Sequence, residues 1–121
     1  MIKLLLLTLL LFVSLDAKEK SYQHEIDHLL LYVQNTECSY VRNGDAHNGK
    51  DARSHIQRKY DYFYDDIKST EDFIRLSATK STMFGNKYYI ECPNIPKVES
   101  SKWLLDELHR YRKTYKSKKG K

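Results

Sequence analysis

An apolar run at the N-terminus is the feature that most constrains what this chain folds into. Lys3 precedes residues 4–13, which are apolar except for Thr8, and the small residue Ala17 follows four positions later. This arrangement is typical of a cleaved export signal, and the run is much shorter than the ~20 apolar residues that cross a bilayer. We therefore expect residues 1–17 to be a signal peptide and the mature chain to be periplasmic or secreted, without a transmembrane span.

The remaining chain is long enough for one small domain with a single core and too short for two. Ten Tyr and four Phe in the whole sequence predict that aromatic side chains fill much of this core. We expect a single helical domain over residues 18–109, followed by a basic helix end and tail over residues 110–121.

Two cysteines, Cys38 and Cys92, lie far apart in the sequence. In an exported chain such a pair predicts one disulfide, and closing so long a loop stabilises a fold by about 3 to 4 kcal/mol on the loop-entropy estimate. The pair lacks the CxxC spacing that redox and metal-binding thiols favour. We therefore predict a structural bridge.

The positive charge of the chain is concentrated at its C-terminus. Residues 18–109 hold thirteen Lys and Arg against fifteen Asp and Glu, whereas residues 110–121 hold seven basic residues and no acid. Two interpretations stay open: the basic segment docks to an anionic surface of the cell envelope, or it is the solvated end of a helix, whose C-terminus favours cations. The seven residues are Arg110, Arg112, Lys113, Lys116, Lys118, Lys119 and Lys121.

Apolar residues recur at helical spacing in four segments. The spacing predicts helices over residues 21–35, 50–67 and 69–80, and a last helix that begins at Ser100 or Ser101. Asn48 or Asp51 is expected to cap the second helix, and Ser69 with Asp72 resembles a capping box at the start of the third.

Two short segments, residues 38–42 and 87–92, alternate as half-buried strands do. Residues 42–49 contain two Asn-Gly pairs and are expected to form a loop. Pairing of the two strands would place Cys38 and Cys92 across one ladder. The sequence therefore predicts a mainly α fold with a small two-stranded antiparallel β ribbon (α+β), about four helices and one disulfide.

Four ordered segments resemble a known family: VRNGDAH at residues 41–47, ARSHIQRKY at 52–60, STEDFI at 69–74 and KSTMFGNKYYI at 80–90. Together they are similar to the YfeK-like family of small exported bacterial proteins, which is a domain of unknown function. The resemblance covers most of the mature chain. It implies a compartment and a layout, and no reaction.

The RNGDAH loop and the helix that follows it are the leading candidate site. An arginine offers a planar fork of donors, Asn-Gly can turn backbone N–H groups toward one point, and a helix N-terminus follows. Such a set suits an anion, such as a carboxylate or a sugar acid. The alternative is structural: the turn is only a turn, Asp45 pairs with Arg42, and His55 bonds within the loop. The candidate residues are Arg42, Asn43, Asp45, His47, His55 and Lys59.

The segment HEIDH matches the H-E-x-x-H pattern of zinc hydrolases, in which His24 and His28 would hold zinc and Glu25 would polarise a water. The apolar stripe of this helix centres almost opposite the two histidines, so we expect them to point to solvent. A catalytic zinc also needs a third protein ligand. We therefore expect neither an enzyme nor a cofactor and retain a zinc-dependent hydrolase as the alternative.

The aromatic cluster at Tyr60, Tyr62, Phe63 and Tyr64 invites comparison with platforms that bind sugars or bases. Helical geometry places Tyr62 about opposite the others, so Tyr62 is expected to be exposed. No recognisable nucleic-acid-binding motif accompanies these residues, and no specific nucleic-acid partner is expected. The predicted partner is an envelope protein or a small anionic ligand.

Overall fold

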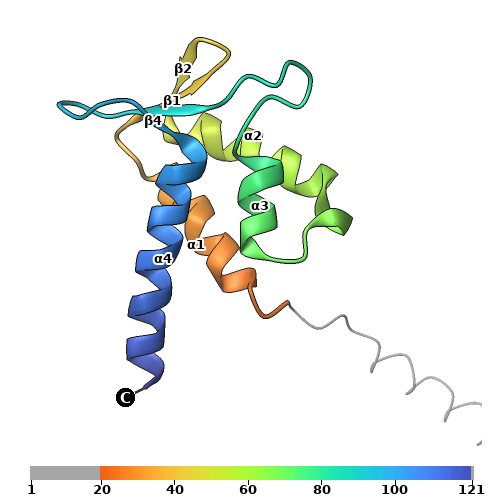
Figure 1. Cartoon of the computed structure of the whole chain (residues 1–121), viewed down its shortest axis with the longest axis vertical. Helices are drawn as coiled ribbons and strands as arrows, with labels where there is room; N and C mark the ends of the chain where they lie inside the picture. The colour runs from red at the N-terminus through yellow and green to blue at the C-terminus, as the bar shows by residue number, and fades with distance from the viewer. Residues whose placement is uncertain (1–19, 121) are drawn as a thin grey trace, which may run out of the picture.

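A computed structural model describes residues 20–120, and the predicted signal peptide lies outside these residues. Four α-helices, one short 3₁₀ helix and four short strands make up this part of the chain (Figure 1). In chain order they are α1 Gln23–Gln34, β1 Ser39–Arg42, β2 Asp45–His47, α2 Gly49–Tyr62, η3 Tyr64–Asp66, α3 Thr70–Ser77, β3 Tyr89–Glu91, β4 Val98–Glu99 and α4 Ser100–Lys119.

The strands form one antiparallel sheet in the order β2-β1-β3-β4. The central pair, β1 with β3, is the predicted ribbon, and Tyr40 lies opposite Ile90 in it. The prediction of only two strands is wrong, because a hairpin adds β2 at one edge and the chain after Pro96 returns to add β4 at the other. β4 has only two residues, Val98 and Glu99, too few for a visible alternation.

The first Asn-Gly pair turns the chain between β1 and β2. Asn43 has φ 50° and Gly44 has φ 84°, and Arg42 lies directly opposite Asp45. Two consecutive positive φ values are what a two-residue hairpin turn requires. The segment predicted as a loop is therefore largely a hairpin, and only the turn and the cap residue Asn48 are irregular.

The helix caps are largely those that the sequence predicts. The Asn48 side chain accepts a hydrogen bond from the Asp51 backbone N–H, 2.9 Å away, at the start of α2. At α3 the Ser69 hydroxyl accepts from the Asp72 N–H, while the Asp72 carboxylate accepts from the N–H of Lys68. The predicted serine cap of the last helix is wrong: Glu99 precedes α4 without a side-chain cap, and Ser100 is buried.

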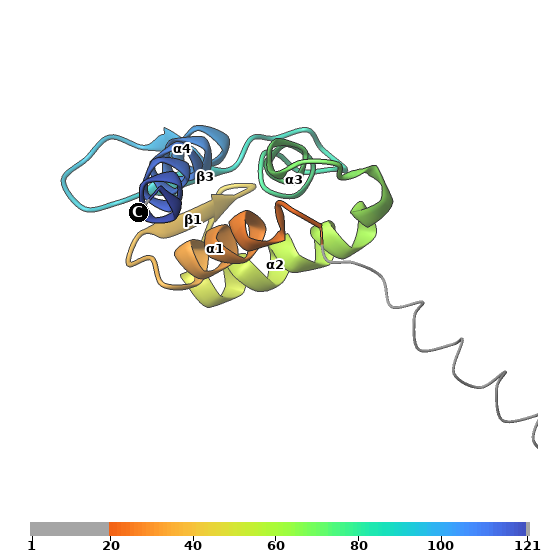
Figure 2. The ribbon, with the colours of Figure 1, turned by 90° about the horizontal axis from the view of Figure 1, so that it is seen from below.

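The core lies among the four helices and extends onto β1 and β3. Figure 2 shows α1 beside α2 on one side of the domain and α3 beside α4 on the other. Four of the buried core side chains are aromatic and the others aliphatic. They are Ile26, Leu29, Leu30, Val33, Tyr40, Ala52, Ile56, Tyr60, Ile67, Phe73, Ile74, Ala78, Tyr88, Ile90, Leu104 and Leu108.

The predicted disulfide is confirmed. Cys38 and Cys92 are bonded, with their Cα atoms 4.4 Å apart. They continue the β1–β3 ladder by one position beyond the pair Ser39 and Glu91, where facing Cα atoms are close enough for such a bridge. The bridge thus joins the chain just after α1 to the chain that leads into β4 and α4.

None of the helices within residues 20–120 combines the length and the apolar character that crossing a membrane requires.

Candidate functional site

The six predicted site residues fall on the β1–β2 hairpin and on the helix that follows it, α2. Arg42 ends β1, Asn43 lies in the turn, and Asp45 and His47 lie on β2. The other two, His55 and Lys59, are one helical turn apart on α2.

Three of them, Arg42, His55 and Lys59, gather near Tyr88. The His55 Nε2 atom lies 3.1 Å from the Tyr88 hydroxyl, and the two rings meet edge to face. The Lys59 ammonium lies 5.2 Å from the centre of the Tyr88 ring and donates a hydrogen bond of 2.6 Å to the Lys80 carbonyl. Tyr88 is buried in the core, so the cluster lies directly against the core.

Burial and nearby positive charge disfavour the protonated forms of His55 and Lys59. Burial, together with the positive charges of Arg42 and Lys59, lowers the pKa of His55 to about 4. Burial also lowers the pKa of Lys59, again with help from Arg42 and Lys80. At neutral pH His55 is therefore uncharged, and the cluster behaves as a centre of positive potential.

The cluster has no acidic counterpart among the described residues. None of the residues Arg42, Arg58 and Lys59 forms an ion pair with another described residue. The Arg42 Nε atom is buried and has no hydrogen-bond partner within residues 20–120, which is unusual for a buried donor. The alternative interpretation, in which Asp45 neutralises Arg42, does not describe this structure.

A groove of about 290 Å³ opens beside the cluster, lined by His55, Arg58, Lys59, Tyr62, Phe63 and Thr82. Four of these residues follow the spacing i, i+3, i+4 and i+7 along α2, so they share one face of the helix. Sequence reasoning found this face only in part and missed Arg58, although the spacing was visible. Thr82 comes from a distant segment of the chain, and no local sequence pattern predicts that it lies beside α2.

The other predicted residues lie apart from this groove. The Asn43 side chain accepts a hydrogen bond of 3.2 Å from the Asn86 amide, and it lines a separate groove of about 300 Å³ together with Gly44 and Lys87. Asp45 is exposed on β2. His47 is half-buried on the same strand.

The two histidines of HEIDH face α4, so the prediction that they point to solvent is wrong. The His24 Nδ1 atom lies 3.0 Å from the Tyr111 hydroxyl, and the His28 Nε2 atom lies 2.6 Å from the Glu107 carboxylate. The His28 ring stacks on Tyr111 with centroids 4.1 Å apart. The helical wheel identified the apolar side of α1 correctly, but α4 covers a second, polar and aromatic side.

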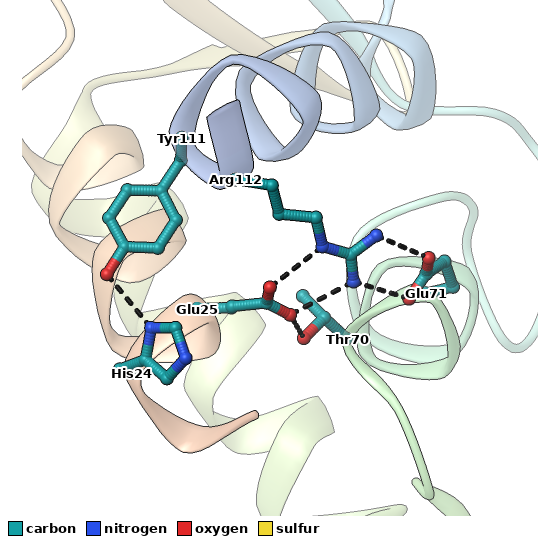
Figure 3. A network of polar contacts seen from close by, with 6 residues as sticks. All are labelled: His24, Glu25, Thr70, Glu71, Tyr111 and Arg112. Atoms are coloured by element: carbon teal, nitrogen blue, oxygen red, sulfur yellow. Dashed lines mark hydrogen bonds and ion pairs between the residues drawn. The ribbon is translucent and has the colours of Figure 1, made fainter. Parts of the chain in front are cut away.

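Glu25, the glutamate of the HEIDH pattern, makes contacts other than those of the two histidines. Figure 3 shows its carboxylate between the hydroxyl of Thr70 and the guanidinium of Arg112, which also binds Glu71. Hydrogen bonds from Arg112 and Thr70 lower the pKa of Glu25 despite its burial. In the part of the chain that the structure describes, no three His, Cys, Asp or Glu side chains are grouped to hold a metal ion.

A larger open groove, of about 880 Å³, lies between α1 and α4 next to the disulfide. Tyr32 and Trp103, whose ring centroids are 4.5 Å apart, contribute to its lining, as do the exposed side chains of Leu31 and Ile95. One end holds Glu107 with its partners His28 and Arg110, so its charges are already paired. Its lining is mainly apolar, as is that of the groove on α2, and the two differ in that the cations beside the α2 groove have no acidic partner among the described residues.

Comparison with known proteins finds relatives of unknown function. The sequence pattern described as "Family of unknown function (DUF5329)" matches residues 20–112. The Uncharacterized protein YfeK of Salmonella typhimurium is 34% identical over 84 residues, which cover 69% of this chain and 68% of that protein. None of the solved structures matches the chain.

Proposed function

This chain belongs to the DUF5329 family, and we propose that it is a non-enzymatic binding module whose groove on α2 takes a small anionic ligand. The observation that carries the proposal is the group of three cations whose charges act on His55, namely Arg42, Lys59 and the neighbouring Arg58. None of the three forms an ion pair among residues 20–120.

The energetics of the cluster favour an anion. Burial and the positive charge of Arg42 lower the pKa of Lys59, so both disfavour its charged form in the unliganded protein. A carboxylate or phosphate would offset this effect and would accept hydrogen bonds from donors that are already in position. Arg42 does not line the groove, but its positive charge acts on His55 and Lys59, which do.

The proposal is tested by titrating the protein with acetate and with inorganic phosphate while the His55 imidazole is followed by NMR. We expect a bound anion to raise the pKa of His55, because it favours the protonated ring. The combined change Arg42→Gln and Lys59→Gln should abolish the response, whereas Lys102→Gln, which removes one exposed charge on α4, should not. An unaltered pKa of His55 at saturating anion would overturn the proposal.

We place this module in the periplasm or outside the cell. The disulfide supports this location, because such bonds persist in oxidising compartments, and the N-terminal apolar run supports it as an export signal. Fractionation of cells that produce the full chain tests it. Recovery of uncleaved protein with free thiols from the cytosol would contradict this location.

A second proposed activity concerns the end of α4. Two of the seven C-terminal basic residues already pair within the body, Arg110 with Glu107 and Arg112 with Glu25 and Glu71. The helix continues to Lys119, away from the sheet (Figure 1), and carries exposed lysines that form no ion pair within the described residues. They are Lys113, Lys116, Lys118 and Lys119, and the seventh basic residue, Lys121, lies outside the described residues.

We propose that this lysine-bearing helix end docks to an anionic lipid surface, where each cation contributes about 1 kcal/mol. Sedimentation with vesicles that contain anionic lipid should recover the protein at low salt and release it at high salt. Changing the four lysines to Gln should remove the binding. Equal recovery with neutral and anionic vesicles would contradict the proposal.

A further inference from the structure

We infer that the groove on α2 takes a six-membered ring that carries one carboxylate, with the ring lying against Tyr62 and the carboxylate at Arg58 and Lys59. This inference rests on the proposed function, since it names the class of anion that the same groove binds. Four features of the groove support it: the two kinds of lining side chain, their order along the helix, the volume, and the exposure of one aromatic ring.

The lining divides into a cationic part and an aromatic part. Arg58, Lys59 and His55 supply donors, and no carboxylate lines the groove. Tyr62 and Phe63 supply aromatic surface, and their rings meet edge to face with centroids 4.8 Å apart. A ligand that matches both parts needs an acceptor-rich anionic group and a flat or weakly polar face.

The order of these residues along α2 sets the distance between the two parts. Tyr62 follows Arg58 by four residues, so the two side chains are neighbours on one helix face, about 5 to 6 Å apart at their Cβ atoms. A guanidinium binds a carboxylate through two parallel hydrogen bonds. A ring bonded directly to that carboxylate would therefore reach Tyr62, whereas a two-carbon acid would not.

Tyr62 is placed for contact with a ligand and has little structural role. Its side chain is 80% exposed, the highest value among the exposed tyrosines, although it lines the groove. Phe63 packs against the core, and its ring meets the ring of Tyr62 edge to face. Covering the exposed ring of Tyr62 with a ligand removes apolar surface from water, which favours binding.

The volume limits the ligand to one ring. The groove measures about 290 Å³, the lower end of the range of about 300 to 1,000 Å³ that holds drug-sized ligands. Thr82 faces this volume from the segment after α3 and offers one hydroxyl to a substituent of the ring. An acidic sugar and an aromatic carboxylate both combine a six-membered ring with one carboxylate. Binding measurements with both compounds show which of the two the groove prefers.

The test compares four probes by NMR titration, with the backbone amides of Phe63 and Thr82 as reporters. Acetate has the charge without the ring, glucose has the ring without the charge, and glucuronate and benzoate have both. We expect at least one ring carboxylate to bind about tenfold more tightly than acetate, and glucose to bind negligibly. Preference for glucuronate identifies a sugar acid, and preference for benzoate identifies an aromatic acid.

Two variants separate the ring from the charge. Tyr62→Ala, at a highly exposed position, should reduce the affinity for the ring carboxylate to that for acetate and leave acetate binding unchanged. Tyr64→Ala is the matched control, because Tyr64 is an exposed tyrosine outside the groove lining. Arg58→Gln should lower the affinity of the protein for all three anions.

The outcomes distinguish this inference from the proposed function. Equal affinities for acetate and both ring carboxylates, or a Tyr62→Ala variant that binds them as the natural chain does, would overturn the inference while anion binding stands. A chain that binds none of the three anions would overturn the proposed function and the inference together.

Discussion

Glu25 and Arg112 lie 87 residues apart in the chain and are joined by two hydrogen bonds of 2.8 and 3.0 Å. Arg112 also binds Glu71 at the start of α3 through two more hydrogen bonds, so one guanidinium links α1, α3 and α4 (Figure 3). The disulfide at Cys38 holds the chain beyond the other end of α1. Helix α1 is therefore fastened to the rest of the domain near both ends.

Replacing Arg112 with Met should lower the free energy of unfolding by about 2 to 3 kcal/mol, because the buried carboxylate of Glu25 loses its charged partner. The loss stays below that of a fully buried pair, since the Arg112 side chain is 37% exposed. The measurement is urea unfolding at neutral pH. As a control, Lys102→Met breaks an exposed pair with Asp106 on the same helix and should cost less than about 1 kcal/mol. Equal losses in both variants would contradict the assigned role of Arg112.

The stability of the domain should fall in acid partly through this network. Hydrogen bonds from Arg112 hold the pKa values of Glu25 and Glu71 below their ordinary value of 4.5. A carboxylate with a lowered pKa contributes stability above its ordinary value, and this contribution is lost as the pH falls through the lowered value. Urea midpoints measured from about pH 6 to pH 3 should show the difference between the natural chain and Arg112→Met shrinking with acidity. A constant difference would rule this linkage out.

His55 should titrate near pH 4 in the unliganded protein, because burial and the charge of Arg42 both disfavour the imidazolium. Its pKa is lowered from 6.5, so its contribution to stability is present above pH 6.5 and is lost as the pH falls toward 4. NMR titration of the ring measures the value directly. Arg42→Gln should raise it, and His109→Gln, at an exposed position on α4, should leave it unchanged. Titration of His55 near 6.5 in the natural chain would contradict the cation cluster.

Gly49 begins α2 where this helix touches the end of α1. A Cβ atom at this position would collide with the backbone carbonyl oxygens of Val33 and Gln34. Gly49→Ala should therefore destabilise the domain by about 1 to 3 kcal/mol through forced displacement of α1. Gly120→Ala is the matched control, since its nearest neighbour, the Lys116 carbonyl oxygen, lies at an ordinary 3.5 Å. Thermal unfolding of the two variants compares them, and coincident midpoints would contradict the close packing at Gly49.

Features with local partners were predictable from the sequence. The Asn48 cap and the Ser69–Asp72 pair are formed by atoms three residues apart, so the pattern itself carries the information. The alternation around Ile90 likewise identified β3, whose neighbour Tyr88 is buried as expected. Ser100 shows the limit of such reasoning. Its hydroxyl lies 2.6 Å from that of Tyr40, 60 residues away, and a competing tertiary contact replaces the predicted cap.

The candidate site was predictable to the same degree. His55 and Lys59 were recognised by their spacing on one helix and their position beside a turn. Arg58 was missed although it shares their face, and Thr82 was missed because only the fold brings its segment to α2. Asn43 was placed in the site by proximity in sequence, yet its side chain binds Asn86 elsewhere. Contacts between distant segments leave no periodic signal, which accounts for both kinds of error.

By itself the sequence determined the helices, the central strand pair and the disulfide of this protein, because periodicity, capping and cysteine pairing depend on spacing along one chain. Only the tertiary structure decided what covers each polar face. In the folded protein His24 and His28 pack against α4, and Glu25 pairs with Arg112. The cations Arg42 and Lys59 lie near each other without an ion pair among the described residues. Charge pairing is a property of distances in space, and those distances exist only once the core has closed.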